Sequence, residues 1–209
     1  DLGTLWVDMN ACGVDALISV PQKGWSGSPC AGLVMLSPLA SERLKETTSS
    51  SFACDLKKWR EIMAAYENGG HAYHATMPTD SLRDFVGVMR ETQDMGFAEA
   101  KAAQESLGLK IRALMERHGF KSLAAPGFQA ASVVVSYTSD PDLQTGKRFM
   151  EQGMQIAAGV PLQCDEGPDF RTFRIGLFGL DKIKNVDRTV SLFRSEEHTS
   201  ELQSPDHLV

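Results

Sequence analysis

Residues 16–36, with the sequence ALISVPQKGWSGSPCAGLVML, constrain the fold of this chain most strongly, because they place one lysine between two apolar runs. The first run, residues 16–20, has the aliphatic and β-branched composition of a buried strand. Pro21 ends it, a loop rich in glycine, serine and proline follows, and residues 31–36 form a second apolar run. The pattern predicts two neighbouring buried strands joined by a tight loop that holds Lys23.

A lysine in such a loop has two interpretations. It can be an ordinary solvated side chain, as most loop lysines are. If the loop instead keeps water away from Lys23, the amine loses its proton more easily, and a neutral amine is a nucleophile that forms an imine with a carbonyl compound.

Composition excludes several classes of function. The 209 residues are 42% hydrophobic and 23% charged, which suits a globular chain with one large core or two smaller ones. A net charge of −6 argues against a nucleic acid or an anionic membrane as partner, and no apolar run is long enough to span a bilayer. The four cysteines form no Cys-x-x-Cys pair, and no carboxylate or cysteine cluster accompanies His71 and His74. We therefore predict no metal site and no disulfide framework.

Periodicity gives a coarse secondary structure. A helical pattern over residues 82–115 is long for one globular helix, so we expect a break near Met95 and Gly96. The order of elements after about residue 103 is typical of a small α/β domain. The expected strands are 5–7, 16–20, 31–36, 132–136 and 173–178, and the other expected helices are 41–46, 56–66, 146–157 and 183–193.

The lysine loop carries a recognisable motif. Ser19, Gln22, Lys23, Gly27 and Pro29 occur in the order and spacing S-x-x-Q-K followed by a glycine and proline loop. This segment resembles the cofactor-lysine motif of class V aminotransferases, which are fold-type I enzymes dependent on pyridoxal 5'-phosphate (PLP), in the alanine–glyoxylate and serine–glyoxylate (serine–pyruvate) branch. The resemblance implies that Lys23 is the catalytic residue and carries PLP as an aldimine, and that Gln22 binds the cofactor phosphate.

Arg174 lies near the start of the last expected strand, in the sequence RIGLFG. An arginine there can hold a carboxylate through two parallel N–H bonds, or it can be a structural or surface residue. The segment resembles the R-[IL]-G-x-x-G motif of the same family. The resemblance implies that Arg174 binds the carboxylate of the amino acid substrate.

Tyr73 and Thr76 offer a phenol and a hydroxyl just before a helix, where both can bind a phosphate. The alternative is a loop in which Tyr73 only packs. With Pro78 the segment resembles the family's Y-x-x-T-x-P motif. The resemblance implies that both residues bind the PLP phosphate of a neighbouring subunit, and hence a homodimer with its active site at the interface.

The resemblance covers residues 1–193 and implies an α/β fold in two parts. Residues 1–95 would be the end of a PLP-transferase large domain with a mainly parallel sheet, and residues 96–193 a small C-terminal domain. Residues 194–204, RSEEHTSELQS, resemble the translation of a sequencing-library adapter, so we expect 194–209 to be a non-native tail. We therefore expect this chain to be a gene fragment that is inactive by itself.

The implied activity is ping-pong transamination, which moves an amino group from alanine or serine to glyoxylate or pyruvate. We expect a cytoplasmic location, or a peroxisomal or mitochondrial one in a eukaryote. A ureidoglycine–glyoxylate aminotransferase remains an alternative. A cysteine desulfurase-like enzyme would have histidine where Gln22 stands and a reactive cysteine loop, for which only Cys164 is available. A non-catalytic binding protein of the same fold would need neither Lys23 nor Arg174.

Overall fold

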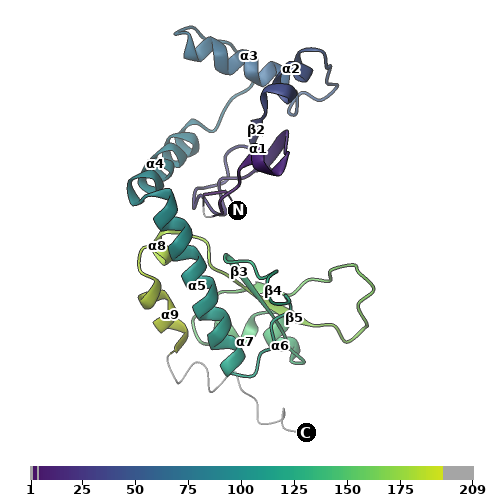
Figure 1. Cartoon of the computed structure of the whole chain (residues 1–209), viewed down its shortest axis with the longest axis vertical. Helices are drawn as coiled ribbons and strands as arrows, with labels where there is room; N and C mark the ends of the chain where they lie inside the picture. The colour runs from purple at the N-terminus through teal and green to yellow at the C-terminus, as the bar shows by residue number, and fades with distance from the viewer. Residues whose placement is uncertain (1, 4, 195–209) are drawn as a thin grey trace.

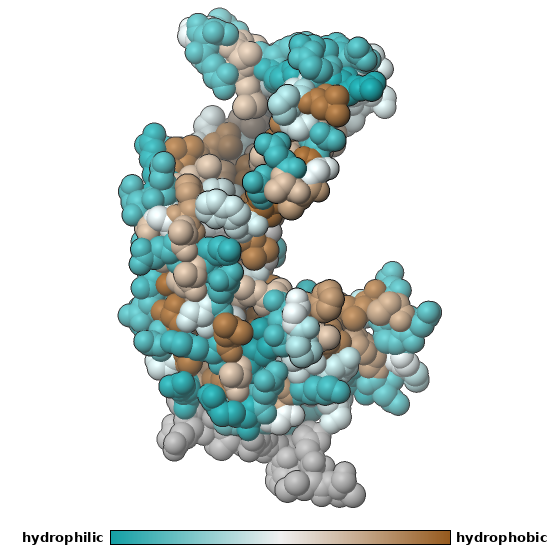
Figure 2. Space-filling model, viewed as in Figure 1, coloured by the Kyte–Doolittle hydropathy of each residue, from teal (hydrophilic) through white to brown (hydrophobic). Residues whose placement is uncertain are grey.

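The computed structural model describes residues 2–3 and 5–194 of the chain. Asp1, Thr4 and residues 195–209, which make up nearly all of the predicted non-native tail, lie outside the described residues. Two long helices, α4 (Thr79–Met95) and α5 (Phe97–Arg117), run end to end along one side of the molecule in Figure 1. The N-terminal elements lie beside α4, and a small sheet packs against α5. Figure 2 shows the surface hollowed between these two parts.

The elements that precede α4 are short. Strands β1 (Ala16–Ser19) and β2 (Leu33–Leu36) pair antiparallel. Ser37 and Asp55 cap the two helices that follow, because each side chain accepts a hydrogen bond from a backbone N–H of the first turn. The helices of this part are α1 (Met9–Cys12), α2 (Pro38–Lys45) and α3 (Leu56–Glu67).

Two expectations about this part are wrong. Strands β1 and β2 are not buried, because they pair only with each other in a two-stranded sheet, and Ile18 is 74% exposed. Their pairing is antiparallel, because the connection between the strands turns back at Pro21, whose carbonyl accepts a hydrogen bond from Gly27. Residues 5–7 form no strand, since only Leu5 makes a single bridge.

The expected break in the long helical pattern is confirmed. Helix α4 ends at Met95, and Gly96, with a φ of 90°, starts the turn into α5. Glycine adopts this backbone conformation at little cost, whereas other residues rarely do. The break therefore has a local cause that the sequence displays.

The C-terminal part contains the main core. Strands β3 (Val133–Tyr137), β5 (Thr172–Gly176) and β4 (Ala157–Ala158) form an antiparallel sheet in that order. Helix α5 covers this sheet with fully buried side chains, among them Leu107, Ile111 and Met115. The remaining helices are α6 (Pro141–Gln144), α7 (Lys147–Glu151), α8 (Leu180–Ile183) and α9 (Val186–Arg194).

Two helix predictions in this part are too long. The helix expected over 146–157 is only α7, because the chain turns at Gly153, which has a φ of 75°, and Ala157 then enters β4. The helix expected over 183–193 is divided between α8 and α9. Within the described residues, no helix combines the length and the apolar character that crossing a membrane requires.

One face of α5 holds the segment that enters β3. Gln104 Nε2 donates to the Ala131 carbonyl at 3.1 Å, and Arg112 Nη2 donates to the Ala130 carbonyl at 3.0 Å. Burial lowers the pKa of Arg112, in keeping with its position in the core. Gly108 lies between these two side chains on the helix face. A Cβ atom at Gly108 would be 2.4 Å from the Ala131 carbonyl oxygen, so only glycine allows this approach.

We predict that Gly108→Ala destabilises the protein by about 1–3 kcal/mol, because the new methyl group forces α5 away from the backbone at Ala131. The matched control is Gly87→Ala in α4, where a Cβ atom would meet nothing within 4 Å. That change should be neutral or stabilise by about 0.5–1 kcal/mol. Urea unfolding of both variants measures the difference. Equal stability of the two variants would contradict the close approach at Gly108.

Candidate active site

The loop that carries Lys23 is closed by its own backbone. The N–H of Gly27 donates to the Pro21 carbonyl and the N–H of Ser26 to the Lys23 carbonyl, both at 2.9 Å. Ser26 adopts a left-handed conformation with a φ of 60°. The expected tight loop is therefore present, and it leaves the Lys23 side chain exposed.

Aromatic side chains fix this loop to the junction of α4 and α5. The ring of Trp25 makes edge contacts with Phe85 of α4 at 6.3 Å and with Phe97 of α5 at 6.2 Å between ring centroids. Gly27 also lies against Phe85, since a Cβ atom at Gly27 would be 2.8 Å from that ring. The loop thus sits on α4 and on α5, the helix that covers the C-terminal sheet.

Strand β5 presents alternate residues to opposite sides. Phe173, Ile175 and Leu177 are buried in the core under α5, and the Leu177 N–H extends the pairing by donating to the Ser132 carbonyl. Because side chains alternate along a strand, Arg174, Gly176 and Phe178 occupy the other face. Glycine in the middle position leaves that face without a side chain between the guanidinium group and the ring.

The structure brings the lysine loop and this face together. Lys23 Nζ lies over the ring of Phe178, 5.4 Å from its centroid. Arg174 is four residues before Phe178, about 13 Å along the strand. Its Nε donates to the Ala158 carbonyl at 2.8 Å, and within the described part of the chain no carboxylate pairs with Arg174 or Lys23. The two motifs, about 150 residues apart in sequence, thus meet at one end of β5.

The other predicted site residues make no hydrogen bond or ring contact with Lys23 or Arg174 within the described residues. Tyr73 is 87% exposed, and Thr76 and Gln22 are exposed as well. In the described residues no hydrogen bond or ring contact links Tyr73 or Thr76 to Lys23 or Arg174. The roles predicted for these three residues stay predictions.

The segment that carries Tyr73 is nevertheless held in place. The ring of His74 stacks on Phe52 with 4.1 Å between centroids and meets the edge of Trp59 at 5.1 Å. His74 Nε2 also lies 3.3 Å from the Phe52 carbonyl oxygen. The linker between α3 and α4 is thus anchored at His74, next to the exposed phenol.

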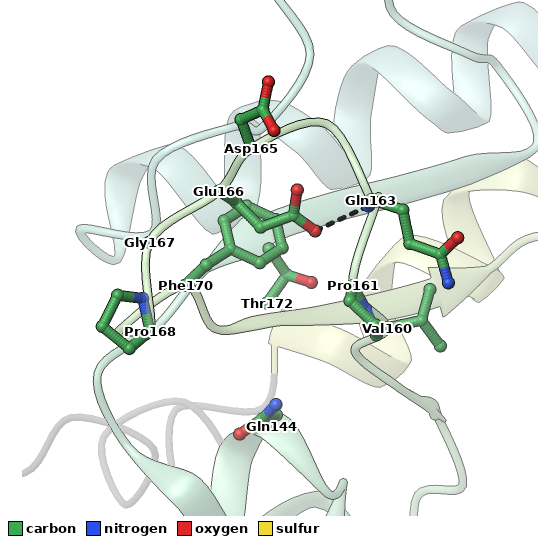
Figure 3. A pocket seen from close by; sticks show the side chains of 10 residues that line it. All are labelled: Gln144, Val160, Pro161, Gln163, Asp165, Glu166, Gly167, Pro168, Phe170 and Thr172. Carbon is green, nitrogen blue, oxygen red and sulfur yellow. Dashed lines mark hydrogen bonds between the residues drawn. The ribbon is translucent and has the colours of Figure 1, made fainter.

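A separate cavity of about 530 Å³ lies in the arm formed by residues 159–171 between β4 and β5, and Figure 3 labels its lining. The carboxylate of Glu166 accepts hydrogen bonds from the backbone N–H groups of Leu162, Gln163 and Cys164. These bonds, the one from Cys164 foremost, lower the pKa of Glu166 to about 2. None of the predicted site residues lines this cavity.

No group of three or more histidine, cysteine or acidic side chains among residues 2–3 and 5–194 could hold a metal ion.

The sequence pattern assigns no role at the site to Phe178, Phe85 or Phe97, although it predicts that Trp25 and Ser26 line the pocket beside Lys23. Phe178 could have been found, because the alternation in FRIGLF places its ring on the face of Arg174. The contacts of Trp25 with two helices more than 50 residues away could not, because only the tertiary fold brings them together.

Comparisons with known proteins identify the fold. No family model matches the sequence, and no curated protein sequence matches it. Among solved structures, alanine–glyoxylate aminotransferase from Nostoc sp. matches with a TM-score of 0.76 and 20% identity, over 97% of this chain and 52% of that one. An aspartate aminotransferase from Thermus thermophilus matches with a TM-score of 0.75 and 24% identity, over 97% of this chain and 53% of its own. Ureidoglycine–glyoxylate aminotransferase from Bacillus subtilis matches with a TM-score of 0.75 and 16% identity, over 96% and 50%.

The chain has the fold of these aminotransferases. The mixed α/β fold class and the resemblance to this group are therefore confirmed. The chain spans about half the length of the structures it matches.

We predict that the arm loses its internal order only in strong acid. Because the folded pKa of Glu166 lies below its ordinary value of 4.5, the stabilisation from its ionised form is complete above about pH 4.5 and is lost as the pH falls through about 2. The amide resonances of Leu162, Gln163 and Cys164 should titrate together over this range in NMR spectra.

Glu166→Gln should open the arm at neutral pH, because the amide nitrogen of glutamine cannot accept the bond from Cys164. Faster hydrogen exchange of these amides measures the opening. Asp169→Asn, which removes an exposed carboxylate of the same arm, is the matched control and should change nothing. In the wild-type protein, titration of the three amide resonances near pH 4.5 instead of about pH 2 would contradict the hydrogen bonds assigned to Glu166.

Proposed function

We propose that the complete protein containing this chain is a PLP-dependent aminotransferase that moves the amino group of alanine or serine to glyoxylate or pyruvate. One observation carries the proposal: Lys23 Nζ lies 5.4 Å from the centroid of Phe178, which directly follows the strand that carries Arg174. A primary amine and a carboxylate-binding group facing one space are what a reaction at the Cα atom of an amino acid requires. The fold supports the same conclusion.

The residues around Lys23 fit a PLP cofactor. The Lys23 amine is exposed, and no carboxylate of the described residues pairs with it, so it can react with an aldehyde. Beside it, Ser26 Oγ is buried without a hydrogen-bond partner in the described part of the chain, and Gln22 offers an exposed amide. These hydroxyl and N–H groups are the donors that a phosphate or a pyridine substituent accepts from.

Lys23 has two tasks in the proposed reaction. Its amine is the attachment point of the cofactor when no donor is present. The amine of the donor displaces Lys23. As a general base, Lys23 Nζ then takes the proton from Cα, and as a general acid it gives the proton back later in the reaction. Bound PLP supplies the electron sink that makes this proton removable and carries the amino group between the two half-reactions.

Arg174 holds the substrate in this scheme. Its Nε is engaged by the Ala158 carbonyl, which fixes the plane of the guanidinium group. The two terminal nitrogens can then bind a carboxylate in parallel. When the carboxylate is held there, rotation about the bond between the carboxylate carbon and Cα determines whether the Cα–H bond points at Lys23.

Tyr73 and Thr76 are proposed to bind the PLP phosphate of a second subunit, and Gln22 that of its own. Their exposure leaves them accessible to another copy of the chain. A homodimer with shared active sites is therefore part of the proposal. The division at residue 95 and the cellular compartment stay predictions.

Ureidoglycine–glyoxylate transamination is a second candidate, because the Bacillus subtilis enzyme of that name matches as well as the others in TM-score. A cysteine desulfurase-like reaction is less well supported. Desolvation of the sulfur, together with the charge of Glu166, raises the pKa of the Cys164 thiol. A desulfurase needs the thiolate form of its cysteine, which this environment disfavours.

We predict that Arg174→Gln raises the KM for alanine about 10- to 100-fold in the complete gene product, because charged hydrogen bonds to the substrate carboxylate are lost. The assay follows pyruvate formed from alanine and glyoxylate. Arg171→Gln is the matched control, since Arg171 precedes β5 and faces Asp169 of the arm. Its KM should equal that of the wild type.

Equal KM values for Arg174→Gln and the wild type would refute the assigned role of Arg174. No transamination of alanine, serine or ureidoglycine by the wild-type protein with PLP would refute the proposed function itself.

A further inference from the structure

The ring of Phe178 has no role in the function proposed so far, yet it is the group that Lys23 contacts. Phe178 follows β5, and its ring lies beside the exposed Gly176, where a Cβ atom would be 3.7 Å from ring atom Cδ2. Lys23 Nζ lies 5.4 Å from the ring centroid. Phe178 is half-buried, which leaves one ring face available to the amine.

This contact gives the lysine amine a defined position. The face of an aromatic ring carries partial negative charge and attracts an ammonium group within about 6 Å of its centroid. In the described part of the chain, no carboxylate forms an ion pair with Lys23. The ring is therefore the group that attracts the charged amine and fixes its position.

The position of the ring matters because of what shares its face of the strand. Arg174 and Phe178 stand on either side of Gly176, which leaves the space between them free of side chains. A methyl group at Gly176 would make only ordinary contact with the ring, so packing does not demand glycine there. The open floor between the guanidinium group and the ring therefore suits a small substrate.

We propose that Phe178 is a positioning residue for Lys23: its ring face holds the amine at the end of β5, the strand that carries Arg174. The proposal rests on the proposed function. When the Cα–H bond of the substrate breaks, the proton forms a new N–H bond on Lys23 Nζ, and PLP, where bound, would take up the electron pair. Lys23 is an ammonium group at that moment, and the ring stabilises it there.

The first test measures the contact without cofactor. Trinitrobenzenesulfonate labels accessible lysine amines, and mapping of the labelled peptides gives the rate at Lys23, with Lys121 as an exposed internal reference. Phe178→Leu keeps the bulk but removes the ring, and should speed labelling of Lys23 about two- to fivefold. Phe178→Tyr keeps the ring and should label as the wild type does. Equal rates at Lys23 in all three proteins, or equal acceleration in both variants, would overturn the proposal.

The second test measures the role in proton transfer. In the half-reaction of the complete holoenzyme with alanine, Phe178→Leu should lower the maximal rate about two- to fivefold and leave the alanine concentration for half-saturation unchanged. Phe178→Tyr should restore the rate. A change in half-saturation alone, or no rescue by tyrosine, would overturn the positioning role.

A third measurement needs no variant at Phe178 and covers the case in which leucine prevents folding. The methylene protons of Lys23, assigned by their loss in Lys23→Ala, should be shifted upfield by the ring in the wild-type NMR spectrum. Resonances at ordinary lysine positions would overturn the contact. A wild type that shows the shift but transfers no amino group would instead refute the proposed function, so the two failures are distinguishable.

Discussion

The attachment of the lysine loop to the junction of α4 and α5 is the constraint on which the candidate site depends. Trp25 touches a ring on each helix, and the break at Gly96 sets the angle between them. Helix α5 in turn holds the entrance to β3 through Gln104 and Arg112, and β3 pairs with β5. Lys23 therefore reaches Phe178, at the end of the strand that carries Arg174, because α5 supports both the loop and the sheet.

Local patterns predicted much of this fold. The spacing of apolar residues, read locally, predicts the apolar stripe of α5 and the strands at 133–137 and 172–176. The glycine that ends α4 is visible in the sequence in the same way. The lysine and arginine motifs were also readable, because each occupies a short stretch whose residue order is specific. The contact of Lys23 with Phe178 links the two motifs. Alternation along β5 predicts the face on which Phe178 lies, but the contact also depends on where the fold places the lysine loop.

The predictions that were wrong have tertiary causes. The run at 16–20 looks like a buried strand, yet β1 has only β2 as a neighbour and exposes Ile18. The helix expected over 146–157 stops early because Gly153 turns the chain so that residues near Ala157 can pair with β5. An apolar run shows that a segment can be buried, but whether it is buried depends on the elements that pack around it.

Reductive trapping of the cofactor tests the central claim most directly. The complete gene product would be incubated with PLP, reduced with borohydride, digested and mapped by mass spectrometry. We expect a pyridoxyl group on Lys23 and none at that peptide in Lys23→Ala. A protein that retains no cofactor and leaves Lys23 unmodified would contradict it, and the chain would then share the fold of the aminotransferases while acting as a non-catalytic binding protein.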